Sequence, residues 1–206
     1  MQFQLGTTLM SLGRMADAEG PLRKAAAGGF PPARVTIPEC LLFQEKWAEA
    51  ADAYRAMIKA DPESEALATN WCWFLATCPD PAFRDPSAAA ALARKLTDRF
   101  PTIGYNWQLL GIAHYRAGKW AEALAAFDTV PVPISGRRDN GFFRAMTLWH
   151  VGDRDRARES YRESMTAFKR FPRPRPELVR IQAEAQTLIS ALEPAPPPKP
   201  VPTPRP

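Results

Sequence analysis

NWQLLGIAHYRAGKWAEALAAFDTV, residues 106–130, shows the clearest helical pattern of the chain. Its small and apolar residues recur at helical spacing on both sides of Gly118. Glycine suits a turn between two helices, because it adopts a left-handed backbone conformation at little cost. The residues that share the facing sides are Trp107, Leu110 and Gly111 in the first helix and Ala123 and Phe127 in the second. The stretch therefore predicts two antiparallel helices with closely packed backbones.

The same pattern recurs along the chain. In five places an alanine is followed four positions later by another apolar residue, at successive spacings of 32, 39, 34 and 34 residues. A period near 34 is typical of tetratricopeptide (TPR) repeats and shorter than that of armadillo or HEAT repeats. Residues 106–130 also resemble the W-x2-L-G...A-x3-F pattern of this family closely, with His114 in the usual Tyr position. The pairs are Ala18 with Leu22, Ala50 with Tyr54, Ala89 with Ala93, Ala123 with Phe127, and Ala157 with Tyr161.

The repeats predict an all-α, TPR-like right-handed α-solenoid of about five helical hairpins plus a C-terminal capping helix. The capping helix has an apolar stripe that we expect to close the stack while its other face meets water. Its stripe consists of Leu178, Ile181, Ala185, Leu188 and Leu192. The expected units are residues 1–30, 31–64, 65–103, 104–137 and 138–171, the capping helix 176–192, and a disordered proline-rich tail over 193–206.

Three departures from the repeat are visible. The 39-residue step locates an insertion at TCPDPAFRDP, residues 77–86, which we expect to form a loop between the third unit's helices. Pro38 falls where the second unit's first helix has its middle, so we expect that helix to be short or kinked. The first helix starts at Met1 without a leading cap, so we expect a longer natural chain or a misplaced start. Self-association through this uncapped first repeat is an alternative.

Residues 70–189 resemble the repeat region that follows the catalytic domain of certain large bacterial serine/threonine protein kinases. The matching stretches are LATCPDPAFRDP, LLGIAHYRAGKW, FFRAMTLWHVGDRDRARESY and ELVRIQAEAQTLI. Similar segments are attached to other bacterial regulatory modules. The resemblance implies the recruiting part of a bacterial signalling protein, or alternatively the C-terminal fragment of such a kinase. The 206 residues contain no Gly-rich phosphate loop, HRD-like or DFG-like motif, so we expect no enzyme activity here.

The composition argues against several other kinds of function. Lys and Arg number 27 against 22 Asp and Glu, and acidic residues interrupt the Arg-rich stretch 137–175, so nucleic acid binding is only an alternative. Cys40, Cys72 and Cys78 lack metal-ligand spacing, and neither His114 nor His150 has ligand partners at helical spacing. We therefore expect no metal, cofactor or catalytic residue. With no membrane span or secretory signal in the sequence, we expect a cytoplasmic protein.

The expected partner is a protein or peptide. In a TPR superhelix certain first-helix positions face the concave groove, and aromatic residues and Arg dominate binding energy at such surfaces. Stacking of these residues between repeats is the alternative. The predicted groove residues are Trp73, Gln108, Ile112, Tyr115, Arg116, Phe142, Met146 and Trp149. They lack the Lys and Asn set of a chaperone carboxylate clamp. The tail also carries PxxP spacing, such as Pro197 with Pro200, that suits an aromatic groove.

Overall fold

The computed structural model describes residues 1–129, 140–170 and 175–190. In these ranges the chain forms eleven α-helices, one 3-10 turn and no strand. The helices are α1 (Gln2–Ser11), α2 (Met15–Ala27), α3 (Pro31–Phe43), α4 (Trp47–Ala60), α5 (Glu65–Thr77), α6 (Pro86–Arg99), α7 (Gly104–Arg116), α8 (Trp120–Asp128), α9 (Asn140–His150), α10 (Arg154–Phe168) and α11 (Pro176–Ser190), and the turn is η1 (Pro81–Phe83). None of these helices is long and apolar enough to cross a membrane.

Consecutive helices pair into hairpins, and four of the hairpin turns have the same construction. In each, one residue is left-handed, with φ of 77° at Gly13, 73° at Gly118 and 91° at Gly152. The next residue's N–H donates to the carbonyl five residues back, as from Lys119 to His114 at 2.9 Å, which satisfies a carbonyl at the helix end. The second hairpin places Glu45 in this conformation, with φ of 59°. It is the only non-glycine residue with positive φ in the described ranges.

The small residues of the repeat allow the helices of a hairpin to touch. A methyl group added at Gly111 would lie 2.5 Å from the Phe127 ring, so glycine is required for this contact. Gly6 has the same relation to Leu22, at 2.7 Å. Phe127 and Leu22 are both buried. The expected all-α, TPR-like solenoid is confirmed, and these contacts explain why the repeat pattern produces it.

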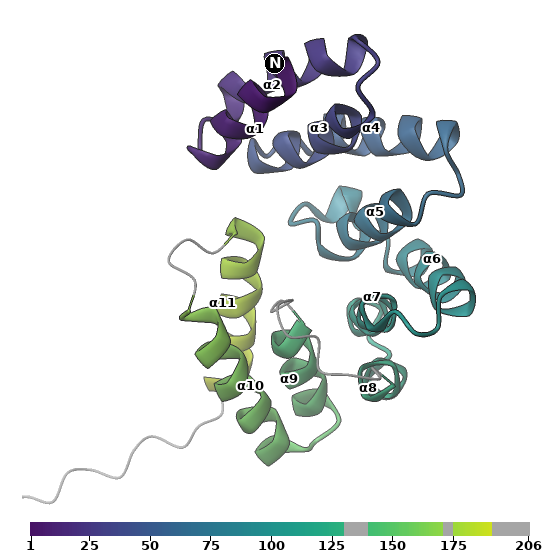
Figure 1. Ribbon diagram of the computed structural model, residues 1–206. Helices are drawn as coiled ribbons and strands as arrows, with labels where there is room; N and C mark the ends of the chain where they lie inside the picture. Colours follow the sequence, from purple (N-terminus) through teal and green to yellow (C-terminus); the bar gives the residue numbers. More distant parts are fainter. Residues whose placement is uncertain (130–139, 171–174, 191–206) are drawn as a thin grey trace, which may run out of the picture.

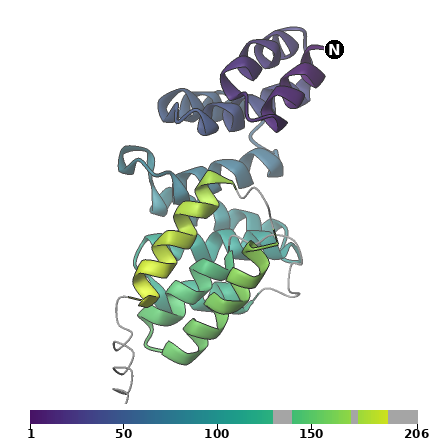
Figure 2. The same ribbon diagram turned by 90° about the vertical axis from the view of Figure 1, so that its left-hand side faces the viewer.

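The helices follow an arc from α1 at the top of Figure 1 to α10 at the bottom. Its inner layer is made by the first helices of the hairpins, since α5 contacts α7 and α7 contacts α9. The contact between α3 and α5 is sparser, and Figure 2 shows α1–α4 as a group set off from the rest. The insertion between α5 and α6 borders this junction, because its turn η1 contacts α4.

The insertion over 77–86 is an ordered loop between α5 and α6. Asp80 accepts a hydrogen bond from the Ala82 N–H at 2.9 Å, and Asp85 accepts one from the Ala88 N–H at 2.8 Å. The turn η1 contacts α4 across the junction. The expectation of a loop between these two helices is confirmed by their positions in the chain.

Pro38 does not shorten α3. The helix runs unbroken over thirteen residues with Pro38 buried inside it. The expectation of a short helix is wrong. A proline removes one backbone donor from the helix, and here its ring is buried in the interior.

The last helix, α11, does not only close the end of the stack as expected, because it also lies along the concave side. α11 begins near α3 and runs along the concave side of the arc (Figure 1). It packs on α9 and α10. An ion pair between Arg175 and Glu39, 136 positions apart in the chain, fixes this approach. Figure 2, which faces this side, shows α11 crossing in front of the later helices.

The stripe of α11 is shifted from the predicted one. Leu178, Ile181 and Ala185 are buried as expected, the fourth buried position is Ile189, and Leu188 is half-buried. Leu192 and the predicted tail over 193–206 lie outside the described residues, as does the boundary predicted between the fourth and fifth units.

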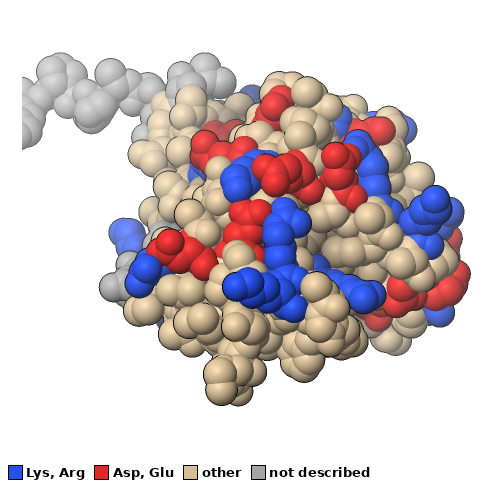
Figure 3. Space-filling view, turned by 90° about the horizontal axis from the view of Figure 1, so that it is seen from above, with Lys and Arg blue, Asp and Glu red and all other residues tan. Residues whose placement is uncertain are grey.

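The surface of the first repeats carries charges of both signs. In Figure 3, which views the molecule from above, Lys and Arg are interspersed with Asp and Glu and form no broad basic patch on this face. Glu19 is an example of these neighbouring opposite charges, because its carboxylate forms ion pairs with Lys46 at 2.7 Å and with Arg23 at 2.8 Å. Such a surface gives no support for nucleic acid binding, which needs a continuous basic region.

Candidate functional site

Most of the predicted groove residues lie beneath α11 or inside the repeats. Six of them are between 0% and 8% exposed: Gln108, Ile112, Tyr115, Phe142, Met146 and Trp149. The expectation that these side chains form an open groove surface is wrong, because α11 occupies the concave side and the helices pack closely around it. Partner contact through these six residues stays a prediction that requires α11 to move.

Arg116 shows how α11 is held. Its guanidinium makes two hydrogen bonds to the Glu184 carboxylate of α11, at 2.6 and 2.7 Å. It also lies 4.9 Å from the centre of the Phe143 ring, as in a cation–π contact. Neighbouring Tyr115 has a raised pKa, first because it is buried and second because Glu184 is close. This predicted groove residue therefore binds a helix of the same chain.

Trp73 is the predicted residue that remains at an open cavity. A pocket of about 220 Å³ lies at the sparse junction between α3 and α5, beneath the beginning of α11. Its walls come from the α3–α4 turn, the end of α5 and its inserted loop, and α11. They are formed by Glu39, Leu42, Phe43, Gln44, Glu45, Trp47, Trp73, Phe74, Thr77, Cys78, Pro79, Arg175, Pro176, Glu177 and Arg180.

Aromatic rings and charged groups alternate around this pocket. Arg175 forms ion pairs with Glu39 and with Glu177, the latter at 3.2 Å, and lies 5.7 Å from the Phe43 ring centre. Arg180 lies 6.0 Å from the Trp47 ring centre. Arg175, directly before α11, and Arg180 of α11 thus meet the aromatic side of the α3–α4 turn.

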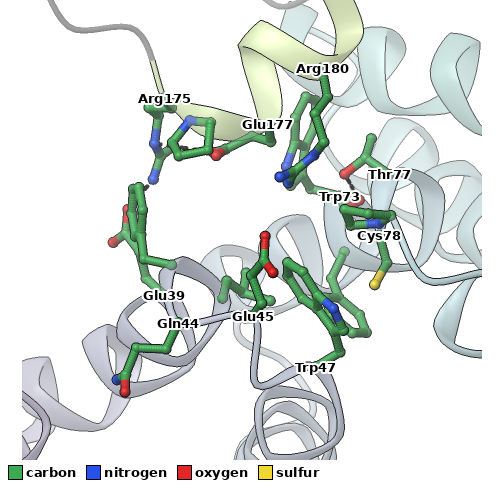
Figure 4. Close-up of a pocket in the computed structure, with 15 residues that line it drawn as sticks. Glu39, Gln44, Glu45, Trp47, Trp73, Thr77, Cys78, Arg175, Glu177 and Arg180 are labelled. Atoms are coloured by element: carbon green, nitrogen blue, oxygen red, sulfur yellow. Dashed lines mark hydrogen bonds and ion pairs between the residues drawn. The ribbon is translucent and has the colours of Figure 1, made fainter. Parts of the chain in front are cut away.

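Two charged groups of the pocket have no opposite charge in ion-pair contact among the described residues, namely Glu45 and Arg180. Figure 4 shows the Glu45 carboxylate directed into the cavity from the turn, next to Trp47, with Arg180 extending toward it from α11. The pocket therefore offers aromatic faces, one available carboxylate and one available guanidinium to a ligand.

A second hollow lies on the other side of α5, between α4, α5 and α6. It is lined mainly by small and aliphatic residues, together with Trp71, Ser64 and the single charges of Asp61 and Lys95. Trp71 stacks on Phe74 with ring centres 5.2 Å apart. This hollow lacks the paired carboxylates and guanidinium groups of the first pocket, so it serves as a reference surface.

Cys78 lies in the pocket wall, and burial raises the pKa of its thiol, which disfavours the reactive thiolate. The three cysteines are buried, and burial raises the pKa of Cys72 to about 12. His114 and His150 have pKa values lowered by burial, and His150 stacks on Trp120 at 4.1 Å. Among the described residues, no three His, Cys, Asp or Glu side chains are grouped for a metal.

Sequence reasoning missed most of this site. Trp47, Glu45 and Arg180 were not predicted to contribute, although two signals were present. Glu45 takes the place of a turn glycine, in QEKWAEA against AGKWAEA with Gly118, and the insertion at 77–86 breaks the period. Both irregularities line one pocket.

Comparison with known proteins agrees with the fold. The family model for the tetratricopeptide repeat matches residues 82–136. A thermophilic TPR protein of Thermus thermophilus superposes with a TM-score of 0.63 at 15% identity, covering 89% of this chain and 96% of that one. A tetratricopeptide repeat protein of Parabacteroides merdae gives 0.61 at 13% identity, covering 92% and 72%. YrrB, described as a TPR protein with an unusual peptide-binding site, gives 0.56 at 17% identity, covering 92% and 89%. No curated protein matches the sequence.

Proposed function

We propose that this TPR-like array is a protein-interaction scaffold that binds an extended segment of a partner at the concave side. The segment docks in the pocket between Trp47 and Trp73. The observation that carries the proposal is this pocket, which combines aromatic walls with a carboxylate and a guanidinium that lack partners among the described residues. Aromatic residues and arginine contribute most of the binding energy at protein interfaces.

The contacts of α11 support the concave side as the binding face. This helix places an apolar stripe on the inner layer and adds the bidentate Arg116–Glu184 pair. That is the helix-in-groove mode of peptide recognition, here used within one chain. YrrB, with its peptide-binding site, supports the same class of ligand for an array of this shape.

The biological setting that we propose is recruitment within a bacterial signalling protein. Its support is the resemblance of residues 70–189 to the repeat regions of serine/threonine kinases. The alternative is that the chain is the C-terminal part of such a kinase. The reading frame upstream of the Met1 codon separates the two: an in-frame kinase domain supports the alternative, an in-frame regulatory module of another kind supports the proposed setting, and an unrelated upstream gene contradicts both.

The binding face is tested by affinity capture from a bacterial lysate with the full chain and two variants. Trp73→Ala opens the pocket wall. Trp71→Ala removes the same kind of side chain from the same helix but on the side of the second hollow. Trp73 and Trp71 are both half-buried, and Trp71 also packs on Phe74 and Tyr54, so the free energy of unfolding of both variants is measured beside their retention of partners. We expect a protein that the native chain and Trp71→Ala retain and Trp73→Ala loses. Equal retention by both variants would contradict the proposed site.

A further inference from the structure

We propose that the pocket between Trp47 and Trp73 binds the chain's own proline-rich C-terminal segment, residues 193–206, within the same molecule. This inference rests on the proposed function, because it names the kind of segment that the pocket recognises. A partner's segment of the same chemistry would then compete with the tail.

The pocket is built from the places where the chain departs from its own repeat. Three hairpin turns use glycine for the left-handed residue, and the second uses Glu45. A non-glycine residue in this conformation is strained, and such strain gathers at functional sites. The inserted loop supplies Thr77, Cys78 and Pro79 to the same wall. An array of regular repeats would have neither Glu45 at a turn nor the inserted loop. Both departures line the same pocket, which points to a ligand there.

The chemistry of the pocket matches a basic proline-rich segment. Such segments adopt the polyproline II conformation and dock on grooves lined with aromatic rings. The pocket presents Trp47 and Trp73 for this purpose. Residues 193–206 contain eight prolines together with Lys199 and Arg205. One of these cations would pair with the Glu45 carboxylate, which no described cation contacts.

The tail is long enough to reach the pocket. The pocket lies at the beginning of α11, and the tail continues from its end at Ser190. The fifteen residues of α11 span roughly 22 Å. Residues 191–199 alone would span roughly 28 Å at about 3.1 Å per residue in the polyproline II conformation. Lys199 and the residues after it can therefore return along α11 to the α3–α4 turn.

Weak affinity is sufficient for such a contact. A segment tethered by a short linker has an effective concentration in the millimolar range. The aromatic and single-charge contacts need only give a dissociation constant in the millimolar range for the pocket to be occupied in a large share of molecules.

The test uses the full chain with a spin label at Thr203→Cys. The native cysteines are buried, and their raised pKa values favour labelling of the introduced thiol. We expect loss of the indole N–H signals of Trp47 and Trp73 in NMR spectra. Trp107 is the internal reference, because its indole donates to the Pro101 carbonyl and lies outside the pocket. The Glu45→Lys variant should recover the two signals, and adding Lys199→Glu with Arg205→Glu should weaken them again.

Three outcomes would overturn the inference. Unchanged Trp47 and Trp73 signals would show that the tail does not visit the pocket. Equal loss in the native chain and in Glu45→Lys would show that no charge match is involved. Loss caused by spin-labelled chains mixed with separate isotope-labelled chains would show docking between molecules. Each result is obtained without a partner, so a failure here leaves the capture experiment with Trp73→Ala to judge the proposed function independently.

Discussion

Arg116 of α7 and Glu184 of α11 form a bidentate ion pair across the concave side, with N···O distances of 2.6 and 2.7 Å. The Arg116 side chain is only 14% exposed. The pair joins the fourth repeat to the last helix, and the aromatic rings of Tyr115 and Phe143 surround it. It is the clearest reason why α11 follows the inner surface instead of leaving it open.

Removing the Glu184 charge should loosen α11. Glu184→Gln leaves the mostly buried guanidinium of Arg116 without its counter-charge, which should lower the free energy of unfolding by about 1–3 kcal/mol. Urea unfolding measures this change, and hydrogen exchange should show faster exchange of the α11 amides. The control is Asp52→Asn, which breaks an ion pair with Arg55 that is mostly exposed. Its effect should stay below about 0.5 kcal/mol. Equal effects of both variants would mean that the Arg116 pair does not hold α11.

Glu45 should be a position where stability and binding conflict. Glu45→Gly removes the strain of a left-handed glutamate and should raise the free energy of unfolding by about 1 kcal/mol. The reverse change at the equivalent turn, Gly118→Glu, should lower it by about 1 kcal/mol. Thermal or urea unfolding of the two variants measures both changes. A Glu45→Gly protein that is less stable than the native chain would show that Glu45 supports the fold and not the pocket.

The close contact of Gly111 with Phe127 predicts an asymmetric response to alanine. Gly111→Ala places a methyl group 2.5 Å from the buried ring and should cost about 1–3 kcal/mol of stability. Gly20 is a matched control, because it lies within α2 and an added methyl group there meets nothing within 4 Å apart from its chain neighbours. Gly20→Ala should stay within about 0.5 kcal/mol of the native chain, because the gain in helix propensity is offset by the clash of the new Cβ with the ring of Pro21. A neutral Gly111→Ala variant would contradict the described packing of the fourth hairpin.

Glu19 should govern part of the acid unfolding of the first two repeats. Hydrogen bonds from Lys46 and then from Arg23 and Gln44 lower its pKa from 4.5 to about 2. A lowered folded-state pKa gives stability that is fully present above pH 4.5 and lost as the pH falls toward 2. Glu19→Gln should therefore unfold at a lower temperature at about pH 7 and lose less stability as the pH falls through that window. Parallel curves of melting temperature against pH for both proteins would contradict this role.

The fold was predictable because its determinants are local. Gly111 with Phe127, and the turn glycine at 118, lie within one 25-residue stretch, and their spacing alone predicts two packed helices. Repetition then predicts a solenoid, since each hairpin needs a neighbour to bury its apolar face.

The course of α11 was not predictable in the same way. Its apolar stripe predicts a helix with one buried face, but the surface that covers this face depends on the curvature accumulated over five hairpins. The Arg175–Glu39 pair joins positions 136 residues apart and leaves no local signal. The substitution of a turn glycine by Glu45 and the insertion at 77–86 were visible in the sequence, but only the structure shows that both lie at one pocket.

Site-specific photo-crosslinking shows whether a bound partner lies in the pocket at Trp73. A photoreactive amino acid is placed at Thr77 in the pocket wall, or at Lys95 in the second hollow on the other side of α5, and the full chain is irradiated with its captured partner. We expect the partner to crosslink from position 77 and not from position 95. Crosslinking from position 95 alone, or equally from both, would contradict a binding site on the concave side.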